Sequence, residues 1–138
     1  MSNTQNYWLV KTEPSTYSYL DLARDRTTVW DGVTNALALK HLRAMKKGDL
    51  AFVYHTGDEK QIVGIAEVAS DPYPDPTQDN PKTVVVDLKP RMRLKRPVTL
   101  AEVKARKEFA GWELVRMGRL SVMPVSPERW KRLCRMAG

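Results

Sequence analysis

The side chains best suited to acid–base chemistry are those of His55, Lys11 and Glu13. His55 ends an apolar run that begins at Leu50, and Lys11 and Glu13 come at the end of a β-prone run that begins at Tyr7. A histidine changes its charge near neutral pH, so it can serve as a general base beside a lysine and a carboxylate. The sequence shows no nucleophile for His55 to activate. We therefore interpret His55 as a structural or ligand-contacting residue, and a small nucleotide or modified-base hydrolase stays as an alternative.

Other catalytic and metal-binding patterns are absent from the sequence. A metal site needs Cys, His, Asp or Glu clustered at ligand spacing, and the two histidines and the single cysteine are isolated. The seven glycines form neither GxGxxG nor a phosphate-binding GxxxxGK followed by Ser or Thr, and there is no GxSxG. We predict no catalytic residue, no metal and no cofactor.

Flat aromatic side chains indicate a different chemistry, the recognition of an unstacked base. Such recognition needs aromatic groups to stack on the base and a few polar groups to contact its edge. Trp30 is the strongest candidate, because Gly32 lets the backbone turn and Asn35 can cap a helix, whose N-terminus suits an anionic group. Tyr54 is another candidate, although large aromatic residues in β-rich domains often belong to the core.

Positive charge is concentrated in the C-terminal part of the chain. Residues 1–88 carry 9 Lys and Arg against 12 Asp and Glu, residues 89–138 carry 14 against 4, and the whole chain has a net charge of +7. A basic region predicts a nucleic-acid partner, because neutralised phosphates release counterions, but it can also serve only solubility. Four cations at alternate positions would either follow a phosphate backbone or form the solvated face of a sheet: Lys89, Arg91, Arg93 and Lys95.

The chain has the size of one domain. Its 138 residues, 42% of them hydrophobic, are enough for a core without a disulfide or metal, so we predict a single domain over residues 1–138. No run approaches the ~18 apolar residues of a membrane span, and residues 1–6 lack the features of a signal peptide. Cys134 has no partner cysteine, which indicates a reducing compartment. We expect a cytoplasmic protein without membrane contact.

Hydrophobic periodicity predicts short strands and short helices. The expected strands cover residues 7–11, 50–55, 61–69, 84–95 and 119–125, with 50–55 and 61–69 forming a hairpin. In the range 84–95 the period is two, which places Met92 on the inner face. Helices are expected at 19–24, after Asn35, in 97–104, in 109–117 and from Pro127 to about Met136, and residues 71–81 are expected to form a surface loop. Strands and helices do not alternate regularly, which favours an α+β open barrel.

Four blocks of sequence, in this order, resemble the EVE domain family. They are Tyr7–Pro14, Trp30–Val33 with Asn35, Gly48–Phe52 with Tyr54 and His55, and Arg119–Val125. The resemblance covers about residues 6–133. It implies a PUA-like open β-barrel of about five or six mostly antiparallel strands with short helices packed around it. The same superfamily includes the YTH readers of methylated adenine in RNA.

The resemblance also implies a function. EVE members are regarded as readers of modified bases, and in bacteria they are often linked with modified-cytosine DNA, in part through fusion to nucleases. A non-catalytic module that holds a modified cytosine of DNA in an aromatic-walled pocket is therefore implied, and any nuclease partner would be a separate protein. Matched by motif, the pocket residues are Lys11, Glu13, Trp30, Val33, Asn35, Tyr54, His55, Ser121 and Met123. The expected phosphate contacts are Lys89, Arg91, Arg93, Lys95 and Arg119.

One stretch departs from the family pattern. After Trp-Asp-Gly-Val many members continue Arg-Asn-Tyr-Gln-Ala-Arg-Asn, whereas this chain has Thr34 to Lys40 with the sequence Thr-Asn-Ala-Leu-Ala-Leu-Lys. The two arginines and the glutamine are missing, so the ligand could differ from the usual one. RNA, including modified tRNA, is the alternative ligand because the PUA-like scaffold is shared. A protein-interaction adaptor is a third hypothesis.

Overall fold

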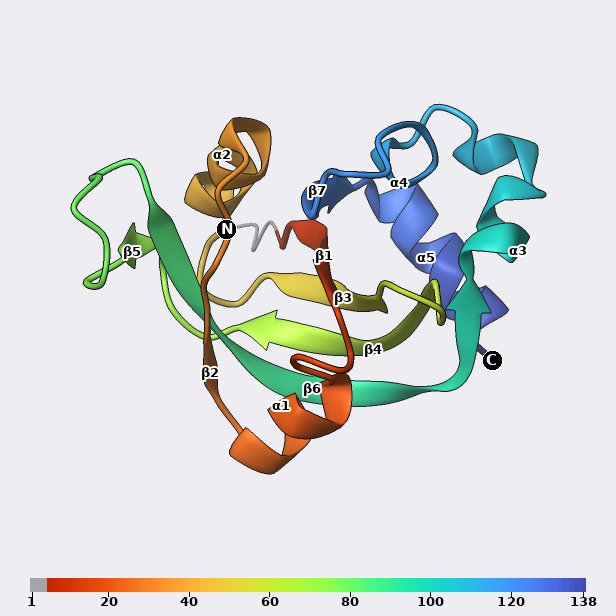
Figure 1. Cartoon of the computed structure of the whole chain (residues 1–138). Coiled ribbons are helices and arrows are strands. Elements are labelled where there is room, and N and C mark those ends of the chain that lie inside the picture. Colours follow the sequence, from red (N-terminus) through yellow and green to blue (C-terminus); the bar gives the residue numbers. More distant parts are fainter. Residues whose placement is uncertain (1–4) are drawn as a thin grey trace.

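One strongly curled β-sheet carries the fold (Figure 1). The computed structural model describes residues 5–138, and in this range six strands follow the order β2-β6-β4-β3-β1-β7 across the sheet. Each pairing along this path is antiparallel except that of β1 with β3, which is parallel. A two-residue strand, β5 (Tyr73–Pro74), pairs with the start of β6. The six strands are β1 (Tyr7–Thr12), β2 (Thr28–Trp30), β3 (Leu50–His55), β4 (Gln61–Val68), β6 (Val84–Thr99) and β7 (Val122–Val125).

Short helices pack around this sheet, which confirms the predicted α+β open barrel. In the view of Figure 1, α1 lies below the curled sheet, α2 lies above it, and the three C-terminal helices gather on one side. The helices are α1 (Tyr19–Asp25), α2 (Ala36–Ala44), α3 (Leu100–Lys104), α4 (Glu113–Arg116) and α5 (Pro127–Met136), with a 3-10 turn, η1, at Lys107–Phe109.

The predicted helix starts are confirmed by their caps. The hydroxyl of Ser18 accepts from the N–H of Asp21 (3.1 Å), and the carboxylate of Asp21 accepts from the N–H of Ser18 (2.8 Å). Asn35 caps α2 through the N–H of Ala38 (3.0 Å), and Ser126 caps α5, where Pro127 is the first residue. Each cap satisfies an N–H that the helix leaves unpaired, and a cap of this kind stabilises a helix by about 1 kcal/mol.

An aromatic stack joins α5 to β1 and β3. The ring of Trp130 lies 4.6 Å from that of Tyr7 on β1 and 3.9 Å from that of Phe52 on β3, with interplanar angles of 21° and 27°. Stacked pairs of this kind contribute about 0.5–1.5 kcal/mol beyond the area that they bury. The stack therefore fixes the C-terminal helix on the two parallel strands.

A buried carboxylate joins β1 to the turn before β3. Asp49 accepts from the indole Nε1 of Trp8 (2.9 Å) and from the backbone N–H groups of Lys46 (3.0 Å) and Asn6 (3.2 Å). A buried charge is tolerated when hydrogen bonds satisfy it, and here three donors do so. This contact sets the register in which β1 meets β3.

Several predicted boundaries are corrected by the structure. Residues 28–30, which the predicted strands did not include, form β2, and a two-residue strand lies inside the predicted loop 71–81. The strand predicted to end at Lys95 continues to Thr99, whose side chain caps α3. The helical region expected over residues 109–117 is divided into η1 and α4. β2, β5, η1 and α4 are each too short to show a hydrophobic period.

Met92 was predicted on the inner face of its strand, and that prediction is wrong. Ala66 of β4 pairs with Pro90 while Ile65 pairs with Met92, so Arg91 is an extra residue in β6. An extra residue shifts the alternation of side chains by one position. Met92 is consequently 53% exposed.

Among residues 5–138, no helix is long and apolar enough to cross a membrane.

Close packing at Gly64 generates a stability prediction. A Cβ atom built on Gly64 of β4 would lie 2.6 Å from Cε2 of Tyr19, so Gly64→Ala forces the first residue of α1 away from the sheet. We expect a loss of about 1–3 kcal/mol in the free energy of unfolding, measured by urea denaturation. Gly111→Ala is the control, because nothing lies within 4 Å of its added Cβ. Equal denaturation midpoints for the two variants would contradict the packing argument.

Candidate functional site

A cavity of about 740 Å³ lies between β1 and β2, which face each other across the open side of the curled sheet. We call this open side between β1 and β2 the seam. Within the part of the chain that the structure describes, β2 is the first strand of the sheet and pairs with β6 only, and β1 lies close to the other edge. In Figure 1 these two strands stand in front of the remaining sheet. The lining comes from the end of β1 and the loop after it, from β2 and the loop after it, and from one residue before β7: Lys11, Thr12, Thr16, Tyr17, Thr27, Thr28, Val29, Trp30, Asp31, Gly32, Val33 and Ser121.

The end of β1 projects beyond its neighbour β7 and reaches the cavity. The pairing of these strands ends at Val10 opposite Val122, and the N–H of Lys11 then donates to the carbonyl of Ser121 (2.9 Å). Lys11 and Thr12 are therefore held by backbone hydrogen bonds while their side chains remain at the seam.

Two aromatic side chains form one wall of the cavity. The rings of Tyr17 and Trp30 meet edge to face, with centroids 6.3 Å apart and an interplanar angle of 81°. The carbonyl of Tyr17 accepts from the hydroxyl of Thr12 (2.7 Å), and its own hydroxyl donates to Asp25 (2.9 Å). Burial, together with the bond to Asp25, raises the pKa of Tyr17. The wall is thus held in place at both ends of the tyrosine.

Gly32 makes the turn that carries the chain from the cavity wall to α2. Its φ of +77° lies in the left-handed region, which glycine adopts without strain. The turn places Val33 against the cavity and leaves Asn35 to begin the helix. This confirms the predicted backbone role of glycine after Trp30.

The cavity combines one cation and one carboxylate with several hydroxyl groups. The Nζ of Lys11 donates to the carbonyl of Gly118 (3.0 Å) and lies 5.6 Å from the ring centroid of Tyr54. Burial lowers the pKa of Lys11. Asp31 is exposed at the other side of the cavity lining. Donors, acceptors and flat rings together suit a planar heteroaromatic ligand with polar edges.

Four of the nine residues predicted for the pocket line this cavity: Lys11, Trp30, Val33 and Ser121. The structure places the other five elsewhere. Asn35 is occupied with the cap of α2, and Met123 is fully buried opposite Leu9 in the β1–β7 pair. Glu13 turns away to accept from Ser15 and Thr56. Tyr54 is buried in the core on β3.

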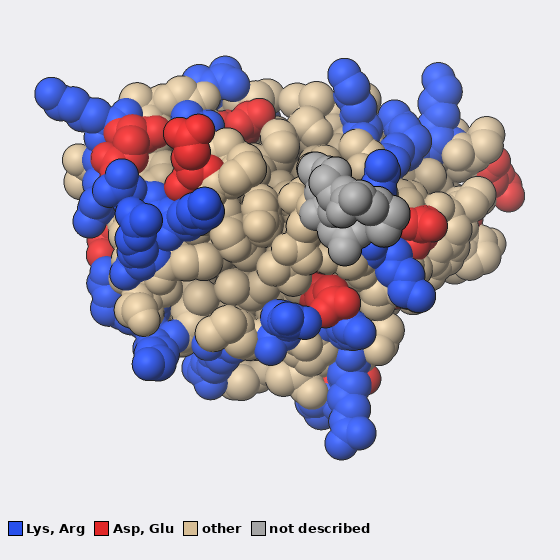
Figure 2. All heavy atoms as spheres, turned by 180° about the vertical axis from the view of Figure 1, so that it is seen from behind, with Lys and Arg blue, Asp and Glu red and all other residues tan. Residues whose placement is uncertain are grey.

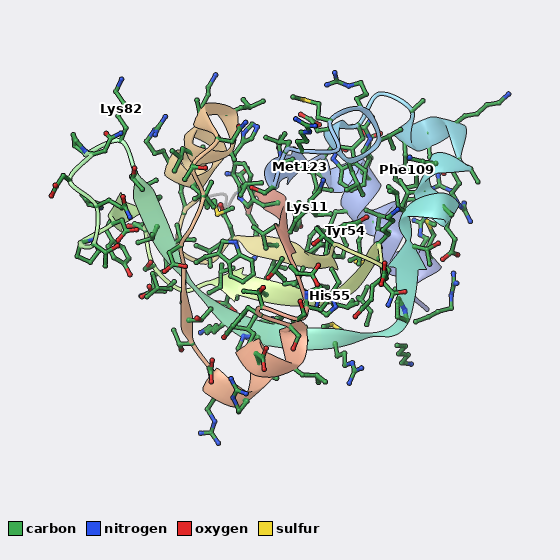
Figure 3. The ribbon with its side chains drawn as sticks, viewed as in Figure 1. Lys11, Tyr54, His55, Lys82, Phe109 and Met123 are labelled. Atoms are coloured by element: carbon green, nitrogen blue, oxygen red, sulfur yellow. The ribbon has the colours of Figure 1, made fainter. Side chains whose placement is uncertain are left out.

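His55, the fifth of these, is engaged at both ring nitrogens. Its Nε2 accepts from the N–H of Tyr19 (3.0 Å), and its Nδ1 lies 2.9 Å from Oε1 of Glu59. Figure 3 shows Lys11, Tyr54 and His55 along the neighbouring strands β1 and β3. A general base needs a free nitrogen that faces the substrate. The structure leaves none on His55.

The predicted phosphate contacts differ in their surroundings. Lys89 and Arg91 both reach Glu67, at 3.6 and 3.0 Å. Arg119 is exposed beside Gly118, near the cavity, and forms no ion pair within residues 5–138. Arg93 pairs with Gly64 across the strands. Figure 2 shows, from behind, that Lys and Arg also gather on the side where α3 to α5 lie.

Sequence reasoning missed Tyr17 and the threonines of the cavity. Thr12, Thr16, Thr27 and Thr28 lie in loops or at strand ends, where a hydroxyl residue is ordinary. The missed strand β2 accounts for Thr27 and Thr28, because without it residues 27–30 have no partner strand and no place in the sheet. For Tyr17, the sequence around it gives no signal that its ring lines a cavity.

The fold agrees with known structures. Rpa0253 from Rhodopseudomonas palustris is 47% identical, with a TM-score of 0.92 over 96% of this chain and 93% of that chain. The structure of human THYN1 protein in complex with DNA containing 5-methylcytosine is 30% identical, with a TM-score of 0.88 over 96% of this chain and 98% of that chain. An ASCH protein from Zymomonas mobilis, at 10% identity and a TM-score of 0.61, shares the fold alone.

The curled half-barrel, with its helices and seam, defines this chain as a domain of PUA-like architecture. The EVE domain profile matches residues 6–136. Thymocyte nuclear protein 1 of Rattus norvegicus is 36% identical over 162 residues, which cover 93% of this chain and 72% of the relative. The chain belongs to the EVE domain family, and the predicted resemblance is confirmed.

Proposed function

We propose that this protein binds DNA that contains a modified cytosine and holds the modified base in the cavity beside Trp30. The observation that carries the proposal is the cavity itself. The rings of Tyr17 and Trp30, with centroids 6.3 Å apart, form one wall of it, and hydroxyl and ammonium groups lie beside this wall. The similarity to human THYN1, solved in complex with DNA containing 5-methylcytosine, supports the same ligand class.

A base in this cavity would have to leave the helical stack. Removing a base from the duplex costs a few kcal/mol, and stacking on an aromatic side chain returns roughly 1–3 kcal/mol per base. Trp30 and Tyr17 offer that stacking surface. Lys11 donates only, and Asp31 accepts only, so together they suit a base edge that has both acceptors and donors.

Phosphate contacts would supply the remaining affinity. The exposed Arg119 follows Gly118, whose carbonyl holds Lys11, so this cation lies near the cavity. A neutralised phosphate releases its counterion and makes binding salt-dependent. Base recognition and phosphate contact therefore have different experimental signatures, preference between bases for the first and salt dependence for the second.

The proposed cavity should distinguish a modified base from a plain one. We expect tighter binding to DNA duplexes with methylcytosine or hydroxymethylcytosine at one site than to the plain duplex, measured by fluorescence anisotropy at two salt concentrations. Trp30→Ala removes the stacking surface and should lower affinity for the modified duplex by roughly 5- to 150-fold. Matched RNA strands compare the two nucleic acids.

Two controls accompany this measurement. Ser121→Phe fills the cavity while retaining Trp30, so it should abolish base preference without removing a core residue. Lys131→Ser, on the exposed side of α5, should leave the preference unchanged. Equal and steeply salt-dependent binding of the plain and modified duplexes by the wild type would count against a base-reading cavity.

A cation without a carboxylate partner should contribute more to the salt dependence of binding than a cation in an ion pair. Arg119→Ser should reduce the slope of log affinity against log salt by about 0.9, the amount expected for one phosphate contact. Arg91→Ser should change the slope less, because Arg91 is already paired with Glu67. Equal slopes for Arg119→Ser and the wild type would remove Arg119 from the interface.

We also propose that binding occurs without chemical change. Both nitrogens of His55 are engaged within the protein, which argues against the reacting group of the hydrolase alternative. Mass spectrometry of nucleosides and modified oligonucleotides after incubation should return unchanged masses. A mass change that depends on the protein would favour the hydrolase.

A further inference from the structure

His55 is buried although it lies at the end of a strand. It is the last residue of β3, pairs with Thr12 on β1 and Gln61 on β4, and is only 6% exposed. It does not line the cavity. Its contacts nevertheless lead, through a few hydrogen bonds, to the aromatic wall.

The two hydrogen bonds of His55 determine its tautomer. Nε2 faces the N–H of Tyr19 at 3.0 Å, and an N–H donates, so Nε2 must carry a lone pair. The proton of the neutral ring then lies on Nδ1, which donates to Oε1 of Glu59 at 2.9 Å. The same carboxylate oxygen accepts from the side chain of Gln61 (3.2 Å). The network is complete only with the proton on Nδ1.

Nε2 of His55 holds the start of α1. Tyr19 is the first residue of that helix, and its N–H is one of the donors that a helix cannot pair internally. The ring of Tyr19 packs against Gly64, and its hydroxyl donates to the carbonyl of Ile65 (2.8 Å). The β3–β4 hairpin therefore fixes Tyr19 by its backbone at one point and by its side chain at another.

The fixed start of α1 positions one wall of the cavity. Thr16 and Tyr17 line the cavity and come three and two residues before Tyr19. At the other end of this short segment, the hydroxyl of Thr12 holds the carbonyl of Tyr17 (2.7 Å). These contacts hold the two ends of the segment that carries the ring of Tyr17, which meets Trp30 edge to face.

We propose that His55 is a positioning residue for base recognition, acting from outside the cavity through its Nε2 bond to the N–H of Tyr19. The inference rests on the proposed function, because it assigns His55 a part in base preference. It gives the histidine of this block of sequence a role other than acid–base chemistry or direct ligand contact.

Two substitutions distinguish the role of Nε2 of His55 from that of Nδ1. The side-chain carbonyl of glutamine reaches the position of Nε2, whereas the shorter asparagine reaches only the position of Nδ1. His55→Gln should keep the preference for the modified duplex within about 3-fold of the wild type. His55→Asn should reduce that preference about 10-fold while the salt dependence of binding stays the same. Full preference in His55→Asn overturns the proposal, as does equal loss in both variants at equal melting temperature.

Nitrogen NMR of the free protein tests the same contact without any ligand. The ¹⁵N shifts of His55 should show an unprotonated Nε2 and a protonated Nδ1. In His55→Asn, the backbone signal of Tyr17 and the indole signal of Trp30 should move, and the indole signal of the distant core residue Trp112 should not. A protonated Nε2, or unmoved Tyr17 and Trp30 signals, overturns the proposal. If the wild type shows no base preference but these shifts are found, the proposed function fails and the positioning contact stands.

Discussion

Parallel pairing between β1 and β3 determines where each wall of the cavity comes from. Parallel neighbours cannot be joined by a tight turn, so the chain must cross to the far end before it returns. Here the crossing contains α1, β2 and α2. β2 adds to the far edge of the sheet beside β6, and the curl of the sheet brings it round to face β1. The seam and its cavity follow from this one connection.

The pairing itself depends on contacts outside the cavity. Asp49 fixes the beginning of β3 against Trp8, and the stack of Trp130 on Tyr7 and Phe52 joins both strands to α5. At the other end of β3, His55 holds the start of α1. β1 thus takes part both in this packing and in the cavity, to whose lining it contributes Lys11 and Thr12.

The sequence predicts much of this fold because its local signals agree with the tertiary contacts. Ser18, Asn35 and Ser126 begin helices as expected, and the hairpin of β3 and β4 is present. Met92 could not be placed, because the extra residue Arg91 is defined by cross-strand pairing and leaves no mark in the sequence. In the site, Trp30 could be found from its glycine turn. Tyr17 could not, because its place depends on hydrogen bonds to Thr12 and Asp25.

All but one of the cavity-lining residues belong to two short stretches, residues 11–17 and 27–33. The second stretch carries two core residues, Trp30 and Val33, and its other five residues are exposed or half-buried. The core and the cavity lining therefore meet at these two side chains. Changes at the other five positions would alter the surroundings of a ligand without repacking the core, so divergence of specificity in such domains requires few mutational steps.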